Sequence, residues 1–341
     1  MNAPLTAKDF ATDQEVRWCP GCGDYAILKC MQKTMADIGA DPDNTVFVSG
    51  IGCSSRFPYY MNTYGFHTIH GRAPAFATGL KLANPALDVW VVTGDGDGLS
   101  IGGNHLLHVI RRNVNLQILL FNNEIYGLTK GQYSPTSRLG TRSPTSPTGS
   151  IDAPLAPGAF ALGAGAKFIA RGIDTDAKKL APVLKAAQEF NGAAFVEIFQ
   201  NCIVYNKDVF ESFVGKKTAK ETQIHVVHGQ PLLFADGTKG LKLNTATLAL
   251  EVVGVGELNG DGAPVNGVPK SDILVHDETN AVIAQMLLTL QSDNYPMPLG
   301  VIYRAPAPSY NDAFWAHHPT QGKRTGKVAD ALRKGSVWKK A

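Results

Sequence analysis

Residues 88–127 constrain the fold more than any other stretch of the chain. They read DVWVVTGDGDGLSIGGNHLLHVIRRNVNLQILLFNNEIYG. The β-branched and aromatic run at 89–93 predicts a buried strand, the apolar spacing that follows predicts a helix, and the run at 116–121 predicts a second strand. Polar residues come directly after both strands. Open α/β sheets bind ligands at the carboxyl edge of their strands, so the sequence predicts a ligand site at this edge.

The turn after the first strand alternates three glycines with Asp95 and Asp97. Glycines let the backbone approach a diphosphate, but an aspartate 4 Å from one would cost about 4 kcal/mol at an effective dielectric constant of about 20. A divalent cation between them reverses the sign of that interaction. The side chains of Asp95 and Asn123 and a nearby backbone carbonyl offer the oxygen ligands that Mg²⁺ prefers. The residues therefore predict a magnesium-bridged diphosphate.

An NAD-binding turn is the main alternative for this loop. It requires GxGxxG spacing and an acidic residue about 20 positions later to bind the ribose. The chain has GxGxG instead, and no Asp or Glu lies between Asp97 and Glu124. These differences disfavour NAD.

The five cysteines suggest a metal site. Cys19 and Cys22 form a C-x-x-C before a helix expected at residues 25–38, a pattern found in redox dithiols, zinc sites and iron–sulfur sites. A closed site needs two more soft ligands, which Cys53 and Cys202 can supply. Four thiolates fit Zn²⁺ or a [4Fe–4S] cluster, and the wide spacing of the last two favours the cluster. Cys30, inside the helix, is expected to be a buried free cysteine.

Composition and charge exclude several classes. A formal net charge of +3 gives no reason to expect a nucleic-acid partner. The first residues have no apolar core typical of a signal peptide, and no uncharged apolar run reaches the 18 residues or more of a spanning helix. We therefore expect a cytoplasmic protein without a membrane segment.

Further strands are expected at 45–48 and 66–69, and a further α-β unit at 167–198. We predict an α/β fold: a mostly parallel, doubly wound sheet with helices on both faces, followed by an irregular carboxyl-terminal extension. The predicted domains are residues 1–205, which hold the cofactors, and residues 206–341, which pack on that domain or on a partner. Residues 322–340 hold seven Lys or Arg against one Asp and either steer an acidic redox protein or form a solvated tail.

Six motifs occur in order over roughly residues 15–210: CPGCGD, GIGCSSR, HGRAPAFATGLKLANP, GDGDGLSIGGNH, FNNEIYGLTKGQYSPTS and QNC. GDG followed by NN resembles the thiamine-diphosphate motif, and the full set resembles the β subunit of 2-oxoacid:ferredoxin oxidoreductases, most closely the 2-oxoglutarate branch. The resemblance implies the thiamine-diphosphate-binding fold. It also implies that an α subunit supplies the glutamate that activates the cofactor, in an αβ or α2β2 heteromer.

The resemblance assigns residues to each cofactor. Cys19, Cys22, Cys53 and Cys202 would bind one [4Fe–4S] cluster. Asp95, Asn123 and the backbone carbonyl of Ile125 would bind Mg²⁺. The residues implied around thiamine diphosphate are Ile51, Gly52, Cys53, Ser54, His70, Gly71, Gly94, Asp95, Gly96, Asp97, Asn123, Ile125, Tyr126, Gly127, Leu128 and Thr129.

The implied reaction is oxidative decarboxylation of 2-oxoglutarate with coenzyme A to succinyl-CoA and CO₂, with electrons passing through the cluster to ferredoxin, or the reverse carboxylation. Arg138 and Arg142, in the long loop after the second strand, could bind the distal carboxylate of a dicarboxylic substrate, or could be solvated or contact a subunit. The alternatives are pyruvate or branched-chain 2-oxoacids as substrates, a non-redox thiamine-dependent decarboxylase or synthase with structural zinc, and a non-catalytic partner subunit.

Overall fold

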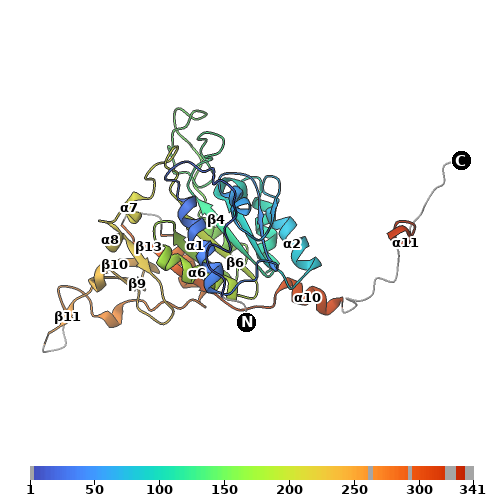
Figure 1. Ribbon diagram of the computed structural model, residues 1–341. Helices are drawn as coiled ribbons and strands as arrows, with labels where there is room; N and C mark the ends of the chain where they lie inside the picture. The colour runs from blue at the N-terminus through green and yellow to red at the C-terminus, as the bar shows by residue number, and fades with distance from the viewer. Residues whose placement is uncertain (1–3, 260–263, 291–293, 319–327, 335–341) are drawn as a thin grey trace.

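The computed structural model describes residues 4–259, 264–290, 294–318 and 328–334 of the 341-residue chain. Its centre is an eight-stranded sheet with the strand order β2-β1-β3-β4-β6-β5-β13-β7 (Figure 1). The strands are β1 (Thr45–Ser49), β2 (Tyr64–His67), β3 (Asp88–Gly94), β4 (Leu116–Asn122), β5 (Phe168–Ile173), β6 (Ala193–Phe199), β7 (Gln223–His225) and β13 (Met297–Arg304).

The first six strands of this sheet are all parallel to their neighbours. Their carboxyl ends therefore meet at one edge, where the turns after β1, β3, β4 and β6 lie together. β13 runs antiparallel to β5, and β7 runs parallel to β13. The mostly parallel sheet expected from the sequence is confirmed.

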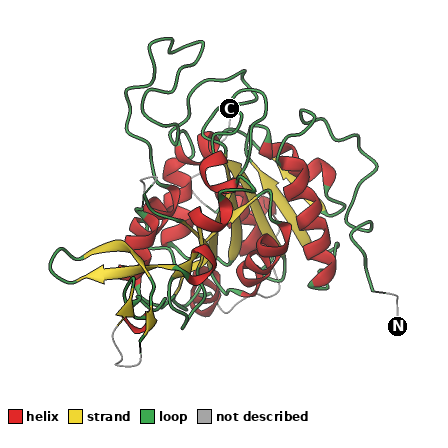
Figure 2. Cartoon of the chain, turned by 90° about the vertical axis from the view of Figure 1, so that its left-hand side faces the viewer, coloured by secondary structure: helices red, strands yellow, loops and turns green. Residues whose placement is uncertain are grey.

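Both faces of the sheet are covered by helices, which Figure 2 shows on either side of the strands. Side chains alternate along β3: Val89 and Val91 belong to one apolar cluster, and Trp90 and Val92 belong to the other. The first cluster includes residues of α2 (Ala73–Ala83), α4 (Gly103–Arg111), α5 (Pro157–Gly163) and α9 (Ala281–Leu288). The second includes residues of α1 (Asp24–Asp37) and α6 (Ala177–Glu189). The doubly wound architecture is confirmed.

The sequence spacing explains how these helices pack. In α1, Ile27, Met31 and Met35 recur every four residues and are fully buried. Burying a side chain of this kind stabilises the fold by about 1.5–3 kcal/mol. The first turn of α6 is capped by Asp176, whose side chain accepts a hydrogen bond from the Lys179 amide at 3.2 Å.

Several elements were not expected from the sequence. α2 was not assigned, and the GDGDG turn continues into a short helix, α3 (Asp95–Leu99). Residues after β6 contribute β7 and β13 to the main sheet, and the yellow-to-orange part of this region gathers on one side of the molecule in Figure 1. The other elements of this part are α7 (Glu211–Val214), α8 (Ala219–Thr222), β8 (Leu233–Phe234), β9 (Lys239–Asn244), β10 (Ala249–Gly254), β11 (Glu257–Leu258) and β12 (Pro264–Val265). The last two helices, α10 (Tyr310–His317) and α11 (Val328–Leu332), are red in Figure 1 and lie on the other side.

The residues after 205 were expected to form an irregular extension, but they are more regular than that, because β7 and β13 complete the main sheet and β8, β9 and β10 form a second one. The domain boundary at residue 205 stays a prediction. Most of the basic segment 322–340 lies outside the described residues. Within the described part of the chain, no helix is both long enough and apolar enough to cross a membrane.

Candidate functional site

A cavity of about 470 Å³ opens at the carboxyl edge of the sheet. It lies among the turns after β1, β3 and β4, and the segment after β6 contributes Gln200. Every residue that the resemblance placed around thiamine diphosphate lines this cavity except Gly71: Ile51, Gly52, Cys53, Ser54, His70, Gly94, Asp95, Gly96, Asp97, Asn123, Ile125, Tyr126, Gly127, Leu128 and Thr129. Residues spread over 79 positions of sequence therefore share one cavity.

Asp95 is almost fully buried at this edge, with 2% of its surface exposed. Its Oδ2 accepts hydrogen bonds from the Ser134 hydroxyl at 2.5 Å and the Thr136 hydroxyl at 2.6 Å. Burial raises the pKa of Asp95 to about 6, although the two hydroxyl donors lower it. Neither hydroxyl donates to Oδ1, so Oδ1 is the oxygen that could bind a metal ion. Ser134 and Thr136 belong to the long loop after β4 (green, at the top of Figure 1), so this loop fixes the Asp95 carboxylate through Oδ2.

Asn123 follows β4 on the same edge. Its Nδ2 donates to Gln200 Oε1 at 2.8 Å, and its Oδ1 accepts from the Ile125 amide at 3.2 Å. Asn206 donates to the Asn123 carbonyl at 2.9 Å and fixes the backbone of this turn. The chain therefore offers a carboxylate, an amide oxygen and backbone carbonyls at one edge, which is a donor set that suits Mg²⁺.

Asp97 has a different part in the site from Asp95. Its Oδ1 accepts from the backbone amides of Ile51 at 3.0 Å and Gly71 at 2.7 Å, and its Oδ2 accepts from the Thr93 hydroxyl at 2.7 Å. These donors come from the turns after β1 and β2 and from β3 itself. One carboxylate thus ties three strand ends together, and Gly71 is held by Asp97 outside the cavity lining.

We expect Asp97→Asn to lower the free energy of unfolding by about 2 kcal/mol. Hydrogen bonds to a charged group contribute about 1.5–3 kcal/mol each. The amide of an asparagine has only one oxygen, so its NH₂ group would face donors that now bond a carboxylate oxygen. Urea unfolding of the apoprotein measures this change. Asp152→Asn is the control, since Asp152 is exposed and its carboxylate accepts a hydrogen bond from the Tyr133 hydroxyl at 2.8 Å. Equal stability of both variants would contradict the anchoring role.

The Tyr126 ring explains the second glycine of the GDGDG turn. A Cβ at Gly96 would lie 2.1 Å from the ring of Tyr126, a distance that no packed structure allows. The Tyr126 hydroxyl donates to the Gly96 carbonyl at 3.3 Å. The absence of a side chain at Gly96 therefore lets the turn after β4 close over the turn after β3.

The four cysteines of the predicted cluster also meet at this edge. A Cβ at Gly127 would lie 3.5 Å from Cys202 Sγ and 3.6 Å from Cys53 Sγ. Cys22 and Cys19 belong to one turn, in which the Cys22 amide donates to the Cys19 carbonyl at 3.0 Å. The Trp18 indole donates to the Cys53 carbonyl at 2.7 Å, which joins this turn to the one after β1. Among the described residues, no three or more His, Cys, Asp or Glu side chains are arranged to hold a single metal ion.

The environment of these thiols is strongly anionic once they ionise. Burial raises the pKa of Cys53 to about 12, and Asp24, Cys202 and Cys19 add to that rise. Burial and Asp24 also raise the pKa of Cys22. Asp24 has only 1% of its surface exposed, and neither carboxylate oxygen has a hydrogen-bond partner. A cationic metal centre is the group that would stabilise several thiolates here, since metal binding releases their protons.

Cys30, the fifth cysteine, lies apart from this group. It is 3% exposed in α1, and its Sγ is 3.6 Å from the Ala177 carbonyl. The expectation that it is buried is confirmed.

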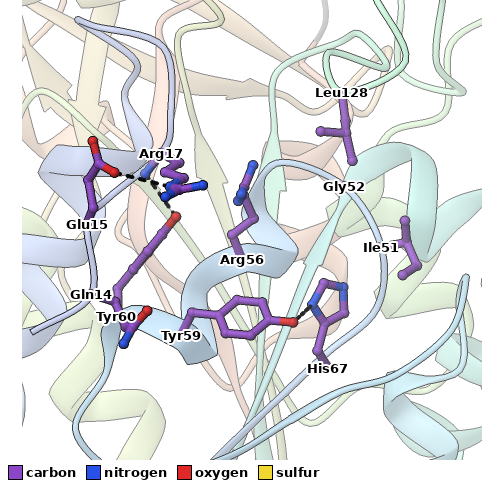
Figure 3. Close-up of a pocket in the computed structure, with 10 residues that line it drawn as sticks. All are labelled: Gln14, Glu15, Arg17, Ile51, Gly52, Arg56, Tyr59, Tyr60, His67 and Leu128. Atoms are coloured by element: carbon purple, nitrogen blue, oxygen red, sulfur yellow. Dashed lines mark hydrogen bonds and ion pairs between the residues drawn. The ribbon is translucent and has the colours of Figure 1, made fainter. Parts of the chain in front are cut away.

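A second cavity, of about 510 Å³, adjoins the first and shares Ile51, Gly52 and Leu128 with it. Figure 3 shows Arg17, Arg56 and the Tyr59–His67 pair around this space. The Tyr59 hydroxyl lies 3.1 Å from His67 Nδ1. Burial and the nearby Arg56 lower the pKa of His67, so the two arginines carry the positive charge of this cavity at pH 7.

Arg138 lies elsewhere. Its guanidinium donates to the Val209 carbonyl at 2.6 Å and to Glu124 at 3.2 Å, and it lines a separate cavity of about 530 Å³.

Three residues of the site were not predicted from the sequence: Arg56, Asp24 and Gln200. They lie in the motifs GIGCSSR, CPGCGD and QNC, respectively. Each of them lies within three residues of a predicted cysteine ligand in the sequence, and this proximity could have indicated that they belong to the site.

The fold and the cavity define a thiamine-diphosphate-binding domain. Residues 50–198 match the family model "Thiamine pyrophosphate enzyme, C-terminal TPP binding domain". The chain is 49% identical over 313 residues to the 2-oxoglutarate oxidoreductase subunit KorB of Mycobacterium tuberculosis, which covers 91% of this chain and 81% of that protein. It is also 49% identical over 197 residues to the β subunit of 2-oxoacid:ferredoxin oxidoreductase 1 of Aeropyrum pernix, covering 58% of this chain and 62% of that protein.

A solved structure of similar fold is the 2-oxoglutarate:ferredoxin oxidoreductase from Magnetococcus marinus with 2-oxoglutarate, coenzyme A and succinyl-CoA bound. The TM-score is 0.74 at 32% identity, and the match covers 97% of this chain and 95% of that chain. This chain belongs to the family of β subunits of 2-oxoglutarate:ferredoxin oxidoreductases. The resemblance drawn from the motifs is confirmed.

Proposed function

We propose that the chain is the β subunit of an enzyme that oxidatively decarboxylates 2-oxoglutarate with coenzyme A to succinyl-CoA and CO₂, and that it passes the electrons through one [4Fe–4S] cluster to ferredoxin. The observation that carries this proposal is the convergence of the thiamine-diphosphate cavity and the cysteines at one sheet edge. Cys53 belongs to both groups of residues, because it lines the cavity and its sulfur lies beside Gly127. A cofactor in this cavity would lie next to the cluster.

The residues of the cavity fit Mg²⁺ and the diphosphate. Asp95 Oδ1, Asn123 Oδ1 and the Ile125 carbonyl would hold the ion, and glycine amides of the turns would face the phosphates. Ser134 and Thr136 keep Asp95 in position. When bound, thiamine diphosphate supplies a carbanion that attacks the keto carbon and then an electron sink for decarboxylation.

The cysteines fit a cluster better than zinc. A structural Zn²⁺ site brings four ligands to within about 2.3 Å of one point, in a tetrahedron. No group of ligating side chains among the described residues has that single-ion arrangement, yet Cys53 and Cys202 are close enough to Cys22 to add to the rise in its pKa. A [4Fe–4S] cluster spreads its four thiolates around a larger centre, and Cys19, Cys22, Cys53 and Cys202 would bind it.

The surface around the cavity supports an α subunit as partner. The acidic side chains that line the cavity within the described residues are Asp24, Asp95 and Asp97, and none of them is a glutamate. Large apolar side chains are exposed on and just after the edge strand β2, at the start of α2 and at the cavity itself: Tyr64, Phe66, Ile69, Phe76, Ile101 and Leu128. Exposed apolar surface of this extent typically marks a protein interface. The partner would cover the cavity and supply the missing glutamate.

We expect the purified β chain alone to show less than about a hundredth of the turnover of the αβ complex, because loss of a positioned acid–base group costs about 10²–10⁴-fold. The assay is viologen reduction that depends on both 2-oxoglutarate and coenzyme A. Comparable turnover without the α subunit would refute the shared site, and no turnover by a cofactor-loaded complex would refute the proposed reaction.

The cavity in Figure 3 supports a dicarboxylic substrate, because Arg56 can bind a carboxylate through a planar pair of N–H donors. We expect Arg56→Met to raise the KM for 2-oxoglutarate about 10- to 100-fold, since a charge-assisted hydrogen bond contributes about 1.5–3 kcal/mol. Steady-state kinetics on the complex measures this effect.

Arg138→Met is the matched control, because Arg138 lines the separate cavity. A large rise in KM in the Arg138 variant with none in the Arg56 variant would place the carboxylate in the other cavity.

A further inference from the structure

Gln200 is a buried amide between the two predicted cofactor sites. It follows β6 directly, and only 1% of its surface is exposed. Its Oε1 accepts a hydrogen bond from Asn123 Nδ2 at 2.8 Å, and its Nε2 donates to Cys22 Sγ at 3.2 Å. One side chain therefore touches a predicted magnesium ligand and a predicted cluster ligand.

At the Asn123 end, Gln200 decides which atom of the amide faces the cavity. An asparagine binds Mg²⁺ through its oxygen, because its NH₂ group has no lone pair to offer. Since Gln200 Oε1 accepts from Nδ2, the oxygen of Asn123 is turned to the opposite side, where the Ile125 amide donates to it at 3.2 Å. A side chain at position 200 that cannot accept a hydrogen bond would leave the orientation of this amide unfixed.

At the Cys22 end, Gln200 places an N–H donor on a sulfur. Cys22 is two residues before Asp24, whose two buried carboxylate oxygens have no hydrogen-bond partner, so Gln200 supplies the side-chain donor at this end of the site. Hydrogen bonds to the ligand sulfurs are among the factors that set the reduction potential of iron–sulfur clusters. A reduced cluster carries one more negative charge than an oxidised one, so a donor to Cys22 favours the reduced state.

The backbone around Gln200 holds the amide in place. The Gln200 amide nitrogen donates to the Asn122 carbonyl at 2.9 Å, and the Gly23 amide donates to the Asn201 carbonyl at 3.2 Å. The second donor of the side chain is also used, because Nε2 bonds the Asn201 carbonyl at 2.8 Å. Gln200 is thus fixed to β4 on one side and to the cysteine turn on the other.

We propose that Gln200 is a positioning residue for both cofactors: it turns the Asn123 oxygen toward Mg²⁺ and raises the reduction potential of the cluster through its hydrogen bond to Cys22. This proposal rests on the magnesium and cluster sites proposed above. The effect on Asn123 and the effect on the cluster can be tested separately, because a glutamate at position 200 keeps an acceptor for Asn123 but has no N–H for Cys22.

The test uses the αβ complex with three variants. Gln200→Glu keeps an acceptor for Asn123 but replaces the donor to Cys22 with a negatively charged oxygen. Gln200→Met removes both donor and acceptor without adding charge and with little change of length. Gln223→Met is the control, because Gln223 is 8% exposed and its amide bonds the Phe213 carbonyl at 2.7 Å, away from both sites. The cluster potential is measured by an EPR-monitored redox titration, and thiamine-diphosphate affinity is measured by calorimetry at fixed Mg²⁺.

We expect Gln200→Met to shift the one-electron equilibrium against reduction by about tenfold, which is about 59 mV toward more negative potential. Gln200→Glu, which also adds a negative charge, should shift it in the same direction by at least as much. Gln200→Met should also bind thiamine diphosphate about fivefold or more weakly, as the loss of one hydrogen bond of about 1 kcal/mol predicts, while Gln200→Glu retains the affinity of the unmodified complex. Gln223→Met should change neither quantity.

Unchanged potentials in both Gln200 variants, or an equal shift in Gln223→Met, would overturn the effect on the cluster. Equal loss of affinity in Gln200→Glu and Gln200→Met would overturn the effect on Asn123. If the unmodified complex itself contains no iron, the proposed function fails before Gln200 is tested, so the two failures are distinct.

Discussion

Asp95→Asn is expected to weaken the binding of Mg²⁺–thiamine diphosphate by at least about 100-fold and to leave the iron content of the complex unchanged. The substitution removes one negative charge from the site of the cation. At 4 Å and an effective dielectric constant of about 20 that charge contributes about 4 kcal/mol, and each 1.4 kcal/mol is a factor of ten in affinity. Asp95 is buried, and its Oδ2 already accepts hydrogen bonds from two hydroxyls. Solvent water at this position therefore does not compensate the cation for the loss of the carboxylate charge.

Calorimetric titration of the apo complex with thiamine diphosphate at fixed Mg²⁺ measures the affinity. Asp152→Asn, on the exposed part of the long loop, is the control for loss of one carboxylate. If Asp95→Asn binds the cofactor as tightly as the control does, Asp95 does not bind the cation.

Cys202→Ser is expected to lower the iron content by more than about tenfold, because a serine hydroxyl does not replace a thiolate and the cluster contributes to the stability of its own site. Cys202 begins a tight turn in which the Asn206 amide donates to its carbonyl at 3.0 Å, so the position of its sulfur is well defined. Iron and acid-labile sulfide assays on anaerobically purified complex measure the loss.

Cys30→Ser is the matched control, since Cys30 is buried in α1 and bonds a backbone carbonyl. Full iron content is expected there. A full complement of iron in Cys202→Ser, or an equal loss in Cys30→Ser, would contradict the assignment of Cys202 as the fourth ligand.

Local sequence patterns predicted the parallel part of the fold well. The runs at 89–93 and 116–121 became β3 and β4, and the polar residues after them lie at one edge, because parallel strands bring their carboxyl ends together. The same rule placed Cys202 beside Cys53 although 148 residues separate them. β13 could not be predicted in this way, because its antiparallel pairing with β5 depends on a strand more than 120 residues away.

The roles of individual polar side chains were harder to predict than their location. Asp95 and Asp97 look equivalent in the sequence, but the contacts of Asp97 come from Ile51, Gly71 and Thr93, which lie on three different segments. Arg56 and Gln200 stood beside cysteine ligands in the sequence, yet their functions depend on which cavity or neighbour the side chain reaches. Such contacts between distant segments are set by the tertiary fold.

The central claim is that electrons from the 2-oxoacid reach a cluster held by this chain. The most direct measurement is the visible absorption of the anaerobic αβ complex before and after addition of 2-oxoglutarate and coenzyme A. The proposed function predicts a brown protein whose iron–sulfur absorption bleaches when both substrates are present and recovers when an oxidant is added. A colourless, zinc-containing complex, or a cluster absorption that the substrates leave unchanged, would contradict it.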